Sequence, residues 1–129
     1  MNIKPNLQFS VLCDEVRRED NGKLMLIGLF EAIHAKQFPA VHSALFIVNR
    51  WCKGEGTFTQ KIRIINTKDG SIIFKTDEQP FELVDIDRNH TLISRVDNLK
   101  FPTPGKYWLE ILLDNELFLN YPIILKEGK

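Results

Sequence analysis

Polar and apolar side chains alternate at every second residue along several stretches of this chain, and no stretch repeats its apolar residues at the helical spacing of about 3.6. In Thr57–Asn66, the clearest example, Phe58, Ile62 and Ile64 fall on one face of an extended strand. A strand of this kind buries one face and leaves the other in water. The alternation therefore predicts an all-β protein.

Short turn motifs separate the alternating stretches at intervals of about ten residues. Asn21-Gly22 and Asp69-Gly70 are typical of tight hairpin turns, because these residues tolerate positive φ angles. Ser43–Trp51 is apolar on both faces, as expected of a central strand that is covered on each side. A chain of 129 residues suits one domain, so we predict a single antiparallel β-sandwich over residues 1–129, with about eight or nine strands.

The side-chain pattern also predicts the register of the last hairpin, Tyr107–Leu125. A three-residue loop, Asp114–Glu116, places only apolar residues opposite one another on the inward face. Shorter loops would bury Asn120 without a partner, at a cost of about 1–3 kcal/mol. We therefore expect the inward pairs Leu113 with Leu117, Ile111 with Leu119, Leu109 with Tyr121, and Tyr107 with Ile123.

The composition argues against several kinds of partner and compartment. The 17 basic residues balance 17 acidic ones, so the electrostatic attraction that dominates nucleic-acid binding is missing. No apolar run reaches the roughly 18 residues that cross a bilayer, and the first residues lack the apolar core of a signal peptide. Cys13 and Cys52 form no CxxC pair and lie in apolar stretches, where free thiols are commonly buried. We therefore expect a cytoplasmic protein that binds neither nucleic acid nor membrane.

Sequence motifs for nucleotides, catalysis and metals are missing. The chain has no phosphate-binding glycine loop, no GxSxG and no HExxH, so we expect no cofactor and no enzymatic activity. Asp85-x-Asp87 begins like a calcium loop, but His90 and Val96 stand where an EF-hand needs glycine and glutamate. A solvated acidic loop is the favoured interpretation of this stretch, and a metal site is the weaker one.

Residues 91–113, TLISRVDNLKFPTPGKYWLEILL, combine an alternating strand, a loop and Gly105-x-Tyr107 at the start of the next strand. This arrangement resembles the E–F corner of immunoglobulin-like sandwiches. The resemblance implies an immunoglobulin-like sandwich of Greek-key type, in which the Tyr107 hydroxyl bonds back to the upstream backbone. Thr103 stands where many members of that family have an aspartate, and Leu109 replaces their second cysteine.

Two longer stretches towards the ends of the chain, LQFSVLCDEVRREDNGKLMLIGLF and FPTPGKYWLEILLDNELFLNYPIIL, resemble a family of small uncharacterised bacterial proteins. The resemblance implies a free-standing sandwich of one domain. It brings no established activity, cofactor or catalytic residue with it.

The sequence thus leaves the function unknown and favours a non-enzymatic module that binds another protein or a second copy of itself. The outward face of the last hairpin offers an apolar strip of four residues for this purpose: Trp108, Leu112, Phe118 and Pro122. Self-association through an exposed sheet edge is a variant of the same hypothesis. Alternatively, the segment around Phe38 folds over the strip and makes it part of the core.

Two further functions stay open at this point. A sugar-binding sandwich would stack Trp108 or Trp51 on a saccharide. A small hydrolase would need one of the three histidines, His34, His42 or His90, to meet a cysteine or an aspartate in a cleft.

Overall fold

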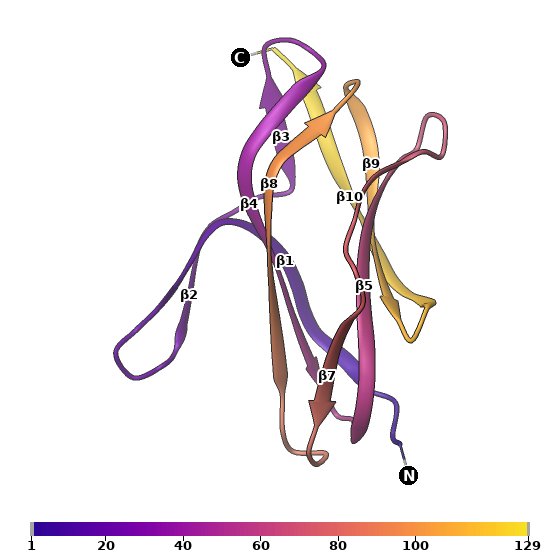
Figure 1. Ribbon diagram of the computed structural model, residues 1–129. Coiled ribbons are helices and arrows are strands. Elements are labelled where there is room, and N and C mark those ends of the chain that lie inside the picture. The colour runs from indigo at the N-terminus through magenta and orange to yellow at the C-terminus, as the bar shows by residue number, and fades with distance from the viewer. Residues whose placement is uncertain (1, 129) are drawn as a thin grey trace.

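The computed structural model describes residues 2–128, which form two β-sheets packed face to face (Figure 1). The strands are β1 (Asn6–Arg18), β2 (Leu24–Leu29), β3 (Ala32–Ala35), β4 (Ala40–Cys52), β5 (Gly56–Asn66), β6 (Ile72–Lys75), β7 (Gln79–Leu83), β8 (His90–Phe101), β9 (Gly105–Leu113) and β10 (Glu116–Glu127). The prediction of an all-β protein is confirmed, with more strands than expected. Residues 2–128 contain no helix long and apolar enough to cross a membrane.

The order of the strands determines which segments are covered. One sheet has the order β2-β1-β4-β8, and the other has the order β3-β10-β9-β5-β6, with β7 also paired to β5. β7 pairs with Gly56–Gln60 and β6 with Arg63–Ile65, so the two short strands share one edge of β5. Every named strand pair is antiparallel except β10 with β3. β4, which the sequence predicts to be central, lies between β1 and β8.

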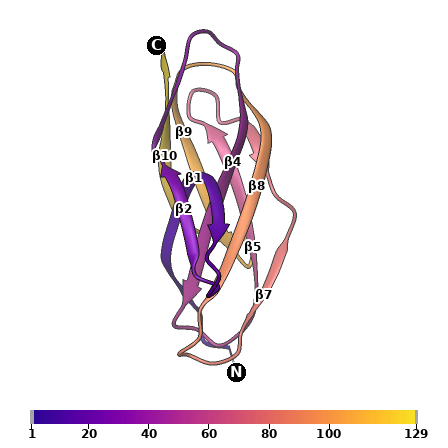
Figure 2. The ribbon, with the colours of Figure 1, turned by 90° about the vertical axis from the view of Figure 1, so that its left-hand side faces the viewer.

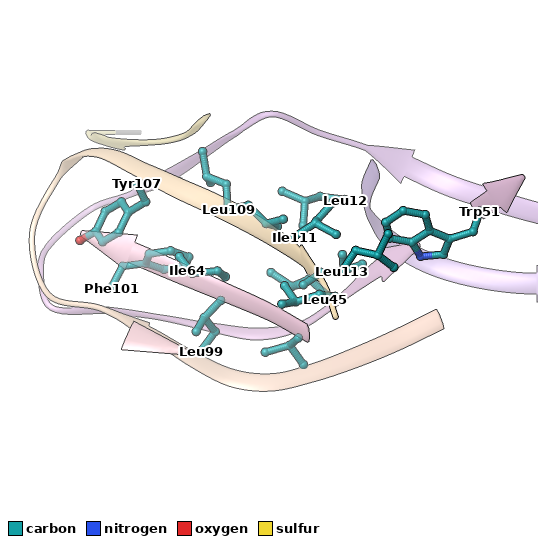
Figure 3. Packing of buried hydrophobic residues seen from close by; sticks show 14 of the residues in the cluster. Leu12, Leu45, Trp51, Ile64, Leu99, Phe101, Tyr107, Leu109, Ile111 and Leu113 are labelled. Carbon is teal, nitrogen blue, oxygen red and sulfur yellow. The ribbon is translucent and has the colours of Figure 1, made fainter. Parts of the chain in front are cut away.

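The core lies between the sheets and is built from the inward positions of the alternating strands. β5 contributes Ile62 and Ile64, as the alternation predicts, and β4 contributes Leu45 and Trp51 from the facing sheet. Figure 3 shows the cluster extending from Tyr107 at one end to Trp51 at the other. Each large side chain buried in this way stabilises the fold by about 1.5–3 kcal/mol, so the pattern that defines the strands also joins the sheets.

A chain of hydrogen bonds crosses the core beside Trp51. Gln60 Oε1, on β5, accepts hydrogen bonds from Trp51 Nε1 (2.7 Å) and Asn49 Nδ2 (3.0 Å), both on β4. Gln60 Nε2 donates to Gln79 Oε1 on β7 (2.9 Å), and Gln79 Nε2 donates to Ser94 Oγ on β8 (2.9 Å). The side chains of Gln60 and Asn49 are fully buried, and Asn49 Oδ1 has no partner among the described residues. Polar side chains thus connect the two sheets through their interior.

Tyr107 forms a second fixed point, at the loop between β8 and β9. Its ring is fully buried, and its hydroxyl donates a hydrogen bond to the Thr103 carbonyl (2.6 Å) and accepts one from the Thr103 N–H (3.2 Å). Gly105, with φ of 128°, opens β9 two residues before the tyrosine. This is the bond to the upstream backbone that the resemblance to immunoglobulin-like corners implies.

The last hairpin has the predicted residue pairs away from its turn, but the turn is shorter than predicted. Leu113 pairs with Glu116 and not with Leu117, around a two-residue turn in which Asp114 and Asn115 both have positive φ (49° and 69°). The residue left over is taken up by a bulge between Leu117 and Leu119. The prediction of a three-residue loop is therefore wrong, because a short turn followed by a bulge preserves the same pairs further along the strands.

The hydrogen-bond chain predicts a large loss of stability for one substitution and a small change for another of similar size. Gln60→Leu removes the partners of Trp51 Nε1 and Asn49 Nδ2 and should lower the free energy of unfolding by about 2–4 kcal/mol. Asn49→Leu leaves the Trp51–Gln60 bond intact and removes the unpartnered Oδ1, so it should change stability by less than about 1 kcal/mol. Urea denaturation measures both values. Equal losses in the two variants would contradict this account of the core.

The two tyrosine hydroxyls give a second test. Tyr107→Phe leaves the Thr103 N–H and carbonyl without their partner and should cost about 1–3 kcal/mol. Tyr121→Phe is the matched control, because the Tyr121 hydroxyl makes one bond to the half-buried Ser10 hydroxyl (2.9 Å) and its loss should cost about 0.5–1.5 kcal/mol. Thermal and urea unfolding would be compared for both variants. If Tyr107→Phe did not lower the free energy of unfolding, the Tyr107 hydroxyl would not hold this loop in place.

Candidate functional site: the projecting hairpin

The apolar strip predicted on the last hairpin is present only in part. Trp108 pairs with Pro122 on the outer face of the six-stranded sheet, whereas Leu112, on the same face of β9, is buried and not available for contact. Glu110 stands between Trp108 and Leu112 along β9 and forms an ion pair with Arg63 at 2.6 Å. A charged row therefore divides the outer face, and the three apolar residues do not form one continuous surface.

Phe118, the fourth residue of that strip, turns into the core instead. It lies in the bulge between Leu117 and Leu119, and its ring meets Trp51 edge-on with 5.0 Å between ring centroids. Phe118 packs against the buried cluster, as does Phe38. The prediction that Phe118 faces outward is wrong, because the bulge reverses the alternation at that residue.

Neither tryptophan is an open platform for a sugar ring. Trp51 has no exposed surface and packs between Phe81 and Phe118, so the hypothesis that it stacks on a saccharide is wrong. Trp108 is half-buried, and the Lys106 ammonium lies 4.2 Å from its ring centroid. Lys106 therefore already occupies one face of the indole.

The histidines lie on separate parts of the structure. His34 is on β3, whereas His42 and His90 pair with residues at opposite ends of the β4–β8 ladder. Nine positions of β4 separate the partner of His90, Trp51, from His42, which corresponds to about 30 Å along a strand. Burial raises the pKa of the Cys13 thiol, which disfavours the thiolate that a nucleophile needs.

The acidic stretch after β7 forms a turn. The Asp85 carboxylate accepts a hydrogen bond from the Asp87 N–H (2.8 Å), and Arg88 lies 3.9 Å from the same carboxylate. Within residues 2–128, no three histidine, cysteine or acidic side chains come together as metal ligands. Asp85 thus caps a local turn of the backbone.

The hairpin predicted at Asn21-Gly22 is present, formed by the end of β1 and by β2, but sequence reasoning missed that it projects from the sandwich. Beyond Cys13, β1 parts from β4, and residues 14–29, here called the arm, stand away from the sandwich (Figure 1). Gly28 lies opposite this point, with a φ of 73° and with the Asp14 carboxylate in the space that a Cβ would fill. A side chain at Gly28 would have to displace the exposed Asp14 carboxylate and would be strained at this φ angle.

β2 is the edge strand of its sheet and has an unusual sequence for that position. Its six residues, LMLIGL, include neither a charged residue nor a proline. Met25, Ile27 and Leu29 are 41%, 41% and 61% exposed and alternate along the strand, so they share one face. The other edge strands carry protecting features: β8 has Arg95, Asp97 and Lys100, β7 has Pro80 and Glu82, and β3 and β6 have only four residues each.

The opposite face of the arm turns towards the sheet. Leu24 and Leu26 point this way and line a cleft of about 410 Å³ together with Phe9, Arg50 and Thr91 of the four-stranded sheet. Figure 2 shows the arm in front of that sheet. β2 is therefore apolar on both faces, one of them exposed and the other half-buried over the cleft.

A hydrogen bond between Ser10 and Tyr121 joins β1 to β10 near the base of the arm. Burial raises the pKa of Tyr121 to about 12, against the lowering effect of the Ser10 hydroxyl, so the phenol stays protonated at neutral pH. Tyr121, Leu29 and Pro122 line a second cleft, of about 490 Å³, at the base of the arm. The base of the arm is thus held to both sheets.

The sequence contains a signal for this arm that the alternation hides. The β2 stretch is apolar at consecutive positions, which is typical of a strand covered on both faces, yet only one strand neighbours it. A strand that is apolar on both faces and lies at a sheet edge indicates a surface that another strand or molecule covers.

Comparison with known families places most of the chain in one of them. Residues 8–126 match the model of DUF6941, described as a family of unknown function. A comparison with curated proteins gives no match.

The position of Phe118 predicts a stability effect that an exposed strip would not give. Phe118→Ala should lower the free energy of unfolding by about 2–4 kcal/mol, because it removes the edge-on contact with Trp51. Leu117→Ala, at the neighbouring 52% exposed residue, should stay within about 0.5 kcal/mol of the unchanged protein. If chemical denaturation showed both variants to be equally stable, Phe118 would not belong to the core.

Proposed function

The chain belongs to DUF6941, a family of unknown function, and we propose from its structure that it is a non-catalytic binding module whose contact surface is the arm. The first occupant we propose is the arm of a second copy. The observation that supports this most is the charge-free edge strand β2, with its exposed row Met25, Ile27 and Leu29.

An open edge strand has a row of unpaired backbone N–H and C=O groups. Proteins that stay monomeric usually protect such an edge with a lysine, a proline or a very short strand. β2 has neither a lysine nor a proline, and the hairpin holds it away from the sandwich, where another strand can reach it. Pairing with an added strand satisfies the backbone groups and buries the apolar row.

Self-complementarity favours a second copy as the added strand. Antiparallel pairing of β2 with β2 of another copy is symmetric about a two-fold axis, so each arm offers the other the same surface. Ile27, near the middle of the strand, would lie close to this axis, and the exposed apolar row would continue from one arm into the other. Glu15 and Arg17 pair with Ile27 and Met25 and form an ion pair with each other, so they add no unbalanced charge to this face.

Two finer features belong to the same proposal. We propose that the sandwich is related to immunoglobulin-like folds, supported by the Tyr107–Thr103 bonds at the loop before β9. We also propose a cytoplasmic location, supported by Cys13 and Cys52, which are both free thiols.

The test is a matched pair of lysine substitutions in the full chain. Ile27→Lys places a charge in the exposed row of β2, and Ile72→Lys places one on β6, at a residue that is 51% exposed. Sedimentation equilibrium over a range of concentrations should show a dimer for the unchanged protein and for Ile72→Lys, and a monomer for Ile27→Lys. Thermal melting checks that all three are folded.

Three results would overturn the proposal. A monomer at the highest attainable concentration of unchanged protein would exclude a second copy as the occupant. Dimers that persist in Ile27→Lys would move the contact away from β2. Loss of the dimer in both variants would show that added charge, and not the arm, is responsible.

A further inference from the structure

The cleft between the arm and the four-stranded sheet has a one-sided charge. Its lining residues are Phe9, Arg18, Gly22, Lys23, Leu24, Leu26, Arg50 and Thr91. The charged ones, Arg18, Lys23 and Arg50, are all basic, in a chain whose formal net charge is zero. A local excess of positive charge in a concave site favours an anionic ligand.

The acidic residues of the arm form no ion pair with these three cations. Glu15 pairs with Ile27 across the hairpin and so lies on its other face, where it bonds to Arg17. Within residues 2–128, no carboxylate lies within 4.0 Å of the side-chain nitrogens of Arg18, Lys23 or Arg50. None of the three cations therefore forms an ion pair within the described chain, and the acidic residues nearest to Arg18 and Lys23 in the sequence, Glu19 and Asp20, are exposed in the turn of the arm.

Arg50 is the best-placed of the three, because the sheet already holds it in position. Its guanidinium carbon lies 5.2 Å from the centroid of the Phe9 ring, and its Nε donates to Thr91 Oγ1 at 2.8 Å. Arg63 and Arg95 on the sheet faces bond to Glu110 and Asp97 instead. A half-buried arginine that is oriented but not paired binds an anion with little loss of side-chain entropy.

The rest of the cleft is apolar. Leu24 and Leu26 form the wall on the arm, and the Phe9 ring lies on the sheet side. The volume of about 410 Å³ suits a small molecule or a single large side chain. The ligand should therefore combine an anionic head with an apolar body of about the size of an aromatic ring.

We propose that this cleft binds a phosphate monoester with an apolar or aromatic body, with the phosphate on Arg50, Arg18 and Lys23 and the body against Leu24, Leu26 and Phe9. Three cations suit a group of charge near −2 better than a carboxylate, and the planar guanidinium fits two phosphate oxygens at once. A free phosphate ester and a phosphorylated tyrosine side chain share this chemistry. The proposal does not depend on self-association, since the exposed row of the arm faces away from the cleft.

Calorimetric titration of the full chain with phenyl phosphate tests the site directly. Arg50→Gln should weaken binding about tenfold or more, because it removes a charge-assisted, two-pronged contact. Arg95→Gln is the matched control: Arg95 lies on the same sheet face, also stacks on a phenylalanine, and bonds to Asp97. It should bind phenyl phosphate as the unchanged protein does, and melting curves confirm that both variants are folded.

A second variant removes charge without touching the sheet. Arg18 and Lys23 are exposed on the arm, so the double change Arg18→Gln with Lys23→Gln should leave the fold unchanged and weaken binding several-fold. Inorganic phosphate should bind more weakly than phenyl phosphate, because it lacks the body that fills the apolar wall. Ile27→Lys should bind normally, which separates this site from the proposed dimer contact.

The outcomes decide both the site and the source of its ligand. Tighter binding of a short phosphotyrosine peptide than of phenyl phosphate would assign the site to a phosphorylated protein, and the reverse would assign it to a free ester. Absence of heat with both ligands, or equal affinity in Arg50→Gln and the unchanged protein, would overturn the proposal. Benzoate binding as tightly as phenyl phosphate would overturn the choice of phosphate.

Discussion

The departure of β1 from β4 after Cys13 is the constraint on which both proposed surfaces of this protein depend. Gly28, with its left-handed φ and the Asp14 carboxylate packed beside it, lies where the hairpin leaves the plane of its sheet. At this bend β1 parts from β4. With it, β2 becomes a projecting edge, and a cleft opens between the arm and the sheet.

The sandwich that carries the projecting arm is held rigid by buried polar side chains. Gln60 joins β4 and β5 through the core, and the bonds continue through Gln79 to Ser94, so polar side chains fix the relative position of the two sheets. Buried hydrogen bonds of this kind are worth little in net stability but are costly to break, which makes one packing of the sheets strongly preferred. Tyr107 restrains the loop at the far end of the core in the same way.

The parts of the fold that the sequence could predict are those that depend on neighbouring residues. Alternation placed Ile62 and Ile64 in the core because the side chains of a strand must point to opposite faces. The two-residue turn at Asp114 and the bulge at Phe118 were not predicted, because a three-residue loop gives the same residue pairs further along the strands.

The projection of the arm could not be predicted for a different reason. The arm's position depends on where β1 stops pairing with β4, a strand far away in the sequence, and its apolar residues resemble those of any buried strand. Arg50 could likewise not be singled out, since its lack of a carboxylate partner depends on which residues the fold brings near it. Candidate sites that need such long-range juxtaposition become visible only once the strands are placed in space.

Hydrogen exchange at the arm, followed by mass spectrometry at several protein concentrations, is the most direct measure of what completes the edge of β2. If a second copy pairs there, the amides of residues 24–27 will exchange more slowly as concentration rises, while those of the β6 edge will not change. Exchange of residues 24–27 at one constant rate across the whole range would show that the edge stays open, and would contradict the account.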